Sequence, residues 1–194
     1  IVEACPFENK GSVMSLLHSF YCWGVVGVVF VSTLFFSLFG IENWRIMACL
    51  WAIVPFINAY NFSICPIERL AEEGKGMTLK ELLSKPAFWV FILLMIGAGA
   101  SEASMAQWAS AFVESALGFS KSIGDLIGPC MFAATMGLSR LLYGKFGHKI
   151  KLLNFMLGSG TLCLICYLMT AISSRPIFGL LGCILCGFSV GIMW

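Results

Sequence analysis

The sequence predicts an all-α membrane protein, a bundle of transmembrane helices. Hydrophobic residues make up 59% of the 194 residues and charged residues only 11%, whereas about a quarter of the residues in a soluble domain are charged. The apolar residues form six long runs, and a helix of about 20 residues already crosses the roughly 30 Å of a bilayer core. The net charge is only +2 and no basic run interleaves with aromatic residues, which excludes a nucleic-acid partner and leaves the lipid bilayer as the main environment.

The six runs have clear boundaries along the chain. They cover Ser12–Phe39, Trp44–Cys65, Ala87–Leu117, Ile123–Leu142, Ile150–Ile172 and Ile177–Trp194. Pro55 lies inside the second run, where a membrane helix tolerates proline, and Pro66 ends that run. Ile1–Lys10 is expected to be the end of a truncated helix and the turn after it. Because the chain starts at Ile1 and Trp194 lies inside an apolar run, we expect a fragment whose missing helices are its nearest partners.

A polar connection at 66–86 separates the first two runs from the other four. It is the longest polar segment of the chain, and Thr78 followed three residues later by Glu81 matches a capping box. We therefore expect a short amphipathic helix here, lying along the membrane surface.

The basic residues predict the orientation in the membrane. If the six runs alternate in direction, nine of the twelve Lys and Arg residues fall on one side: Lys10, Arg69, Lys75, Lys80, Lys85, Arg140, Lys145, Lys149 and Lys151. The other three, Arg45, Lys121 and Arg175, fall on the opposite side. By the positive-inside tendency the first side is cytoplasmic, so connection 66–86 and the turn 143–149 are expected in the cytoplasm of a multi-pass plasma-membrane protein.

Small residues predict close helix packing. Gly124–Gly128 and Gly187–Gly191 have the small-xxx-small spacing that lets two membrane helices approach. Among nine cysteines, Cys163–Cys166 and Cys183–Cys186 form two CxxC pairs, a pattern that indicates zinc or redox chemistry in soluble proteins. Since both pairs lie in apolar runs without polar groups that could hydrogen-bond to metal ligands, we expect them to pack helix against helix, with no metal and no cofactor.

The third run carries the strongest candidate for a functional residue. Glu102 lies near its middle, where a carboxylate costs at least about 2.5 kcal/mol and persists when it faces a cavity or a partner. Gly97–Ser101 beside it is rich in small residues, which let a backbone or a ligand approach and can loosen the helix. A polar midpoint in a loosened helix is typical of transporter substrate sites; the alternative is a glutamate hydrogen-bonded between helices for packing alone.

Other polar residues of this run lie on a different helical face. Ser104, Gln107 and Trp108 share one face, whereas Glu102 lies on another. Gln107 offers donors and an acceptor that suit hydroxyl groups, and Trp108 offers a flat apolar surface for a sugar ring, with a packing tryptophan as the equal alternative. Both faces can reach one cavity only if the helix is distorted at Gly97–Ser101.

The first two runs add polar residues at depth. His18 and Tyr21 share a face of the first run, so both are candidates for binding a polar solute, and His18 is also a candidate proton carrier. A histidine satisfied by a neighbouring helix is the equal alternative for His18. In the second run Asn58 and Asn61 have the same spacing and need hydrogen-bond partners. Glu114, near one end of the third run, is expected to be a solvated charge.

No enzyme motif is complete. His18 and His148 are the only histidines, and the chain lacks HExxH, a Walker loop and a dinucleotide fingerprint. Leu157–Gly160 matches part of an intramembrane serine protease loop, but it lacks the leading glycine and a later histidine base. We therefore expect no catalytic residues and no enzymatic activity. A channel is disfavoured because no filter sequence is present.

The order of runs and connections resembles the major facilitator superfamily. In that fold two halves of six helices are joined by a cytoplasmic loop with a surface helix, which connection 66–86 matches. The resemblance implies that residues 1–65 are the end of the first half, helices 5 and 6. Residues 87–194 would be the start of the second half, helices 7 to 10. The chain would then hold six of an expected twelve transmembrane helices.

The turn after the fourth run is similar to a motif of this family. Gly144–Lys149 resembles the basic Asp-Arg-x-Gly-Arg-Arg hairpin, with glycine in place of the aspartate and histidine in place of one arginine. The resemblance implies a gating turn, with the candidate residues Arg140, Lys145, His148 and Lys149.

Within the superfamily, Ser15–Gly24 and Ser101–Trp108 resemble helices of fucose-permease-like sugar transporters. This resemblance implies a secondary transporter of a small polar solute, such as a sugar, by alternating access with protons as the coupling ion. The expected solute-binding residues are Glu102, Ser104, Gln107, Trp108, His18, Tyr21 and Asn58. The alternative from another class is a receptor or scaffold that keeps the fold but does not transport.

Overall fold

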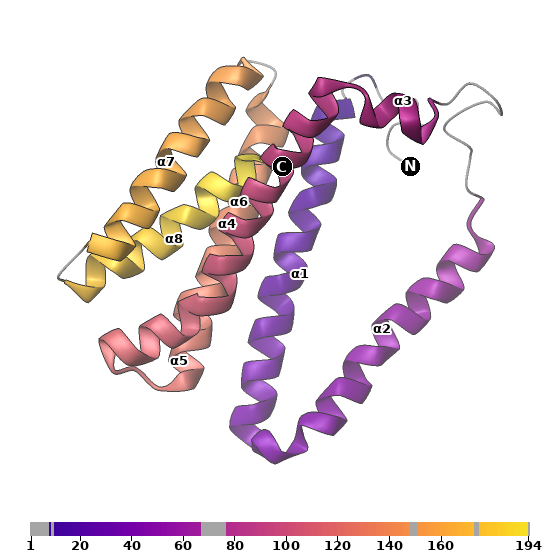
Figure 1. The fold of residues 1–194 in the computed structure, drawn as a ribbon. Coiled ribbons are helices and arrows are strands. Elements are labelled where there is room, and N and C mark those ends of the chain that lie inside the picture. Colours follow the sequence, from indigo (N-terminus) through magenta and orange to yellow (C-terminus); the bar gives the residue numbers. More distant parts are fainter. Residues whose placement is uncertain (1–7, 9, 67–76, 148–150, 173–174, 194) are drawn as a thin grey trace.

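The computed structural model describes residues 8, 10–66, 77–147, 151–172 and 175–193, and these residues form helices without any strand. The helices in chain order are α1 (Lys10–Phe39), η2 (Ile41–Asn43), α2 (Trp44–Ile64), α3 (Leu79–Leu83), α4 (Pro86–Leu117), α5 (Lys121–Asp125), η3 (Leu126–Cys130), α6 (Met131–Phe146), α7 (Leu152–Ile172) and α8 (Pro176–Met193). Within the described residues, six helical segments are long and apolar enough to cross a membrane. Figure 1 shows them as an elongated helical bundle, so the predicted all-α membrane fold with six spans is confirmed.

The fourth span differs from the prediction in its shape and its end. The helical segment extends past Leu142 to Phe146 and contains the π-helical turn η3. Pro129 lies in this turn, and a proline inside a helix removes a backbone hydrogen bond and displaces the preceding turn. Because α6 continues beyond the predicted end, Arg140 lies deeper in the bundle than the run Ile123–Leu142 implies.

α1 and α2 form a hairpin closed by a short turn. Gly40 has φ 82°, a backbone conformation that favours glycine, and η2 follows it. Trp51 Nε1 donates a hydrogen bond to Ser32 Oγ at 3.1 Å, which joins the two helices. α2 otherwise leans away from the bundle (Figure 1), and Met47 is its only buried residue.

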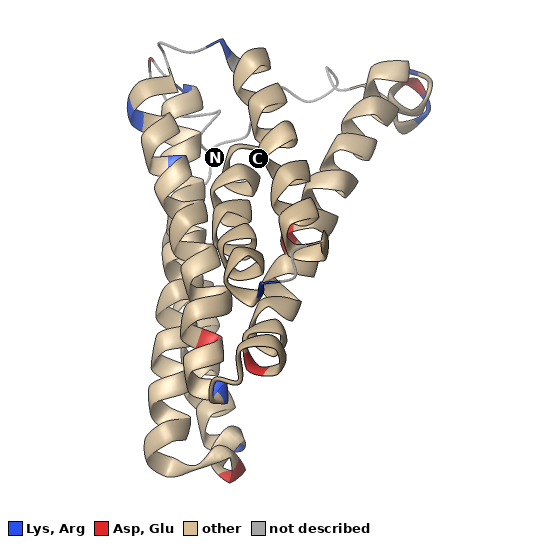
Figure 2. Cartoon of the chain, turned by 90° about the vertical axis from the view of Figure 1, so that its left-hand side faces the viewer, with Lys and Arg blue, Asp and Glu red and all other residues tan. Residues whose placement is uncertain are grey.

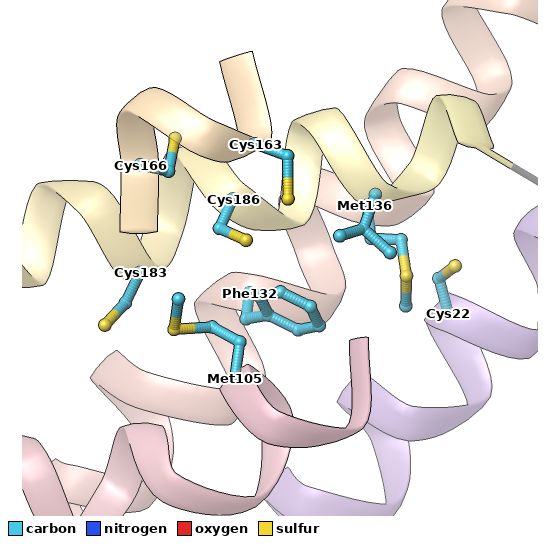
Figure 3. Packing of buried hydrophobic residues seen from close by; sticks show 9 residues of the cluster. Cys22, Met105, Phe132, Met136, Cys163, Cys166, Cys183 and Cys186 are labelled. Atoms are coloured by element: carbon cyan, nitrogen blue, oxygen red, sulfur yellow. The ribbon is translucent and has the colours of Figure 1, made fainter. Parts of the chain in front are cut away.

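The apolar core lies where α4, α6, α7 and α8 meet, with α1 along one side. Phe132 and Met136 of α6 are the largest fully buried side chains. They belong to one cluster with Met105, Val190, Cys22, Cys163, Cys166, Cys183 and Cys186, most of which Figure 3 labels. The two CxxC pairs therefore pack α7 against α8, as predicted. Among the residues that the structure describes, no group of three or more His, Cys, Asp or Glu could hold a metal ion.

α6 and α8 cross closely because α8 presents glycines to α6. A Cβ atom on Gly187 would overlap the carbonyl oxygen of Phe132, and one on Gly191 would overlap a side chain of α6. On the other side of the bundle, a Cβ atom on Gly128 would lie 2.8 Å from the backbone of Ala109 in α4. The close approach predicted for both small-xxx-small segments is confirmed.

The capping box at the start of α3 is also confirmed. The backbone N–H of Thr78 donates to Glu81 Oε2 at 2.8 Å, and the Glu81 N–H donates to Thr78 Oγ1 at 3.3 Å. Because the bond from the Thr78 backbone stabilises the charged carboxylate, the pKa of Glu81 lies below its usual value. The Trp89 indole donates to the Leu83 carbonyl at 2.9 Å and ties α3 to the start of α4.

The connections alternate between two ends of the bundle. The start of α1, the helix α3 and the end of α6 lie at the same end (Figure 1), as alternating spans require. More of the Lys and Arg residues, blue in Figure 2, lie toward this end than at the opposite end.

Candidate functional site

Glu102 lies on the face of α4 that packs into the bundle. Ala98, Met105 and Ala109, at i−4, i+3 and i+7 from it, are all buried. Glu102 itself is partly buried. The carboxylate therefore lies on the side of α4 that faces the other helices.

The other candidate residues of α4 lie on a different face. Ser104, Gln107 and Trp108 are exposed, and 67% of the Trp108 side chain is accessible. At 3.6 residues per turn, Gln107 and Trp108 are rotated by roughly 120–140° from Glu102 around the helix axis. They therefore do not meet the Glu102 carboxylate in one cavity.

α4 is one uninterrupted α-helix from Pro86 to Leu117, without the distortion at Gly97–Ser101 that would let both of its faces reach one cavity. The Ser101 hydroxyl donates to the Gly97 carbonyl at 2.8 Å, within the same helix. The Tyr167 hydroxyl of α7 donates to the Ser101 carbonyl at 2.8 Å. These bonds support a regular helix across the small residues, so the condition under which both faces of α4 would reach one cavity is not met in this structure.

Tyr21 of α1 lies between two charged residues. Its hydroxyl is within interaction distance of the Glu102 carboxylate of α4. The guanidinium carbon of Arg140, from α6, lies 6.0 Å from the centre of the Tyr21 ring. Three helices thus bring Tyr21, Glu102 and Arg140 together, and we call these residues the Tyr21 cluster.

Arg140 is the only charged residue of the described chain that is fully buried, with 4% of its surface accessible. Its Nη1 donates to the His18 carbonyl at 2.9 Å and to Cys22 Sγ at 3.2 Å, and its Nε donates to the Gly191 carbonyl at 3.3 Å. The described residues provide no carboxylate in ion-pair contact with it. All the acceptors that hold this cation are therefore neutral.

This position corrects the assignment of Arg140 to the turn after the fourth span. Arg140 lies within α6, roughly 9 Å before the helix ends at Phe146, and is bonded to α1 and α8. Lys145 also lies inside α6, where its ammonium is 5.5 Å from the centre of the Phe146 ring. His148 and Lys149, the other candidates for the gating turn, lie outside the described residues.

His18 and Asn58 are placed differently from the Tyr21 cluster. The His18 side chain is exposed, and it is the backbone carbonyl of His18 that accepts the bond from Arg140. Asn58 is exposed on α2, which leans away from the bundle (Figure 1). The structure does not bring Asn58 to the other candidate residues.

Sequence reasoning missed the burial of Arg140, although a signal for it exists. Phe132, Met136 and Arg140 follow one another at intervals of four, so they share one face of α6, and all three are buried. An arginine on the apolar face of a membrane helix is expected to face the bundle interior rather than lipid. Spacing within the run, rather than distance from its end, would have identified it.

A second charged group joins α4 to α5. Ser110 Oγ lies 2.6 Å from Asp125 Oδ1 and 3.1 Å from Glu114 Oε1. Lys121 Nζ lies 3.1 Å from the same Asp125 oxygen and 3.6 Å from Glu114 Oε1. Glu114 is thus paired with its neighbours, while 35% of its side chain stays accessible, so the expected solvated charge is also an ion-pair partner.

The chain matches a known protein family over its whole length. The family described as Major Facilitator Superfamily matches residues 1–194. No match was found among curated proteins or among solved structures. The all-helical fold and the six membrane-capable helices of the described residues agree with the family match. The chain belongs to the major facilitator superfamily, a family of membrane transporters.

Proposed function

We propose that this chain belongs to a secondary transporter that moves a small polar solute by alternating access, with a proton as the coupling ion. Membership in the superfamily supports the transporter class. The sugar class of solute rests on the resemblance of Ser15–Gly24 and Ser101–Trp108 to fucose-permease-like transporters.

The Tyr21 cluster is the main structural support for this proposal. Charged side chains inside a membrane bundle are costly and commonly mark the path of a solute or an ion. A phenol, a carboxylate and a guanidinium together supply both donors and acceptors, which suit a solute rich in hydroxyl groups. The three side chains come from three different helices, as expected for a site between moving parts of a transporter.

Glu102 is the proposed proton-binding residue. In its ionised form it is an acceptor for the Tyr21 hydroxyl, and protonation removes the charge that strengthens this contact. The proposed division of the chain assigns α1 to the first half of the transporter and α4 to the second. Proton binding at Glu102 would then weaken a contact between the halves and couple the proton to their relative motion.

The proposal includes the division of the chain and its orientation. Residues 1–65 would end the first half and 87–194 would begin the second, joined by the cytoplasmic connection 66–86. The turn 143–149 would also be cytoplasmic, in the plasma membrane. The larger share of Lys and Arg residues toward one end of the bundle supports this orientation (Figure 2). Ser104, Gln107, Trp108, His18 and Asn58 remain candidates for solute binding in this proposal.

Uptake by the transporter reconstituted in liposomes tests the proposal. Labelled sugars, amino acids and organic anions are compared for the wild type, Glu102→Gln and Glu42→Gln, with and without a proton gradient. Glu42 is exposed in the turn η2, so the same change of charge there is a matched control. We expect Glu102→Gln to abolish sugar uptake or to make it independent of pH, and Glu42→Gln to behave as the wild type.

Each part of the proposal can fail separately. Wild-type uptake that ignores both external pH and a collapsed proton gradient would contradict proton coupling. Uptake that Glu102→Gln leaves unchanged would make Glu102 a packing residue. A folded wild-type protein that takes up nothing would favour the alternative, a receptor or scaffold with the same fold.

A further inference from the structure

A cavity of about 270 Å³ lies beside Arg140, between α1, α6, α7 and α8. Its polar lining comes from Ser15, His18, Arg140 and Tyr143, and the rest of the lining is apolar or glycine. None of the described residues that line it is acidic. The described lining therefore includes an arginine and a histidine but no carboxylate.

The guanidinium of Arg140, a residue that lines this cavity, keeps N–H donors that no described residue accepts from. A guanidinium has five N–H donors, and the bonds from Nε and Nη1 use three of them. Among the described residues, no acceptor is found for the two N–H groups of Nη2. Every fully inaccessible side-chain nitrogen of the described residues has a hydrogen-bond partner, so an Nη2 without a partner is not fully inaccessible. Nη2 is thus accessible although the residue is 4% exposed, and the cavity is the space that Arg140 lines.

Arg140 carries a buried positive charge, and no described residue balances it with a negative charge in direct contact. Carbonyl oxygens and a thiol satisfy its hydrogen bonds but leave its charge unbalanced. Glu102 acts on Tyr21 and Cys22 beside Arg140, yet it is neither in ion-pair contact with Arg140 nor part of the cavity lining. An anion in the cavity would supply both the missing charge and acceptors for Nη2.

We propose that this cavity binds the anionic group of a small molecule, a carboxylate or a phosphate, with Arg140 as the anchor. Ser15 and Arg140 are fixed relative to each other, because Ser15 Oγ donates to the Arg140 carbonyl at 2.9 Å. Tyr143 is held by stacking on Phe155, with 5.1 Å between the ring centres. The site is therefore preorganised on three helices, and its anion can belong to a free solute or to a lipid headgroup.

Binding is measured on the purified protein in lipid nanodiscs, so the result does not depend on transport. The probes are gluconate and inorganic phosphate, with glucose as the neutral control, at constant ionic strength in phosphatidylcholine. We expect gluconate or phosphate to bind and to raise the melting temperature, and glucose to do neither at the same concentration. In nanodiscs that also contain phosphatidylglycerol, loss of binding of the soluble anions would identify a lipid headgroup as the occupant.

Three variants locate the site. Arg140→Gln should weaken binding of the anion by at least about tenfold. Because Arg140→Gln also removes three structural hydrogen bonds, His18→Gln provides a second variant that keeps the His18 carbonyl and changes only an exposed side chain. We expect His18→Gln to weaken anion binding about threefold or more. Lys151→Gln, an exposed cation outside the cavity lining, is the control and should leave binding unchanged.

The outcomes separate this site from a general effect of positive charge. Equal weakening by His18→Gln and Lys151→Gln would overturn the proposal, because the anion would then respond only to the charge of this end of the bundle. Absence of binding by both soluble anions, together with a melting temperature that phosphatidylglycerol does not change, would also overturn it. Either failure would leave the proposed transport of a polar solute through the Tyr21 cluster intact.

Discussion

Replacing Gly187 by alanine should separate α8 from α6 and destabilise the bundle. The nearest atoms to a Cβ atom at this position are the Phe132 carbonyl oxygen, which it would overlap, and Thr135 Oγ1 at 2.5 Å. The first is backbone of a packed helix and cannot rotate away. Thr135 Oγ1 donates to the Ile184 carbonyl of α8 at 2.7 Å, so a displacement of the helices also breaks this bond.

The size of the effect follows from these contacts. Overpacking of a well-packed core costs about 1–3 kcal/mol, and loss of a neutral hydrogen bond adds about 1 kcal/mol. The higher helix propensity of alanine offsets about 1 kcal/mol of this loss of stability. We therefore expect a net loss of roughly 1–3 kcal/mol in the free energy of unfolding, or about 2–12 °C in melting temperature for a chain of this size.

The buried cysteines of the core allow the unfolding of this part of the bundle to be measured. Cys163, Cys166, Cys183 and Cys186 are buried, so a thiol-reactive fluorescent maleimide reports their exposure as the purified protein is heated in detergent. The fluorescence from cysteines that react with the maleimide before the protein unfolds is taken as the baseline. Both α7 and α8 pack in this core, so the signal rises when the interface under test opens.

Gly158→Ala is the matched control. Gly158 lies on α7, and no atom lies within 4 Å of a Cβ atom built on it. The same substitution there should leave the melting temperature unchanged or raise it slightly, because alanine favours the helix. If Gly187→Ala melted at or above the temperature of Gly158→Ala, the tight α6–α8 crossing would be refuted.

Two further predictions concern the polar segments. Since the backbone N–H of Thr78 lowers the pKa of Glu81, the cap of α3 is at full strength above the usual glutamate value of 4.5. It should be lost as the pH falls through the lowered pKa, with a change in Trp89 emission that Glu81→Gln abolishes, because the titrating carboxylate is then absent; a transition that persists in Glu81→Gln would contradict the assignment. Cys65, exposed at the end of α2, should react with a membrane-impermeant maleimide in inside-out vesicles and not in right-side-out vesicles. Labelling of Cys65 in right-side-out vesicles and not in inside-out vesicles would show that the proposed orientation is wrong.

Most of the fold could be predicted because each span is a long apolar run. The predicted and observed boundaries of α1, α2, α4, α7 and α8 differ by at most two residues. Hydropathy does not report the shape of a helix, however, so the π-helical turn at Pro129 was not foreseen. The predicted fourth run ended at Leu142, because it relied on apolar residues, while the polar last turn of α6 continues the same hydrogen-bonded helix.

The candidate site could be predicted only one helix at a time. Glu102 stood out because a carboxylate at mid-membrane depth is unusual in any run. Its neighbour Tyr21 comes from a helix far away in sequence, and the pairing depends on how α1 packs against α4 and α6, which no local pattern encodes. Gln107 and Trp108 have suitable chemistry for a sugar, but the regular geometry of α4 turns them away from Glu102.

The contacts of α1 suggest which part of the bundle moves. The buried residues of α1 are Ser19 and Cys22, both small, whereas the larger apolar side chains of the core come from α4, α6 and α8. Arg140 is held to α1 by hydrogen bonds to a carbonyl and a thiol, and such bonds can be exchanged for bonds to water or to a solute. The apolar cluster has no comparable substitute for its packing. We therefore expect α1 to separate from α6 more easily than α8 does, and this separation would open Arg140 and Glu102 to a solute.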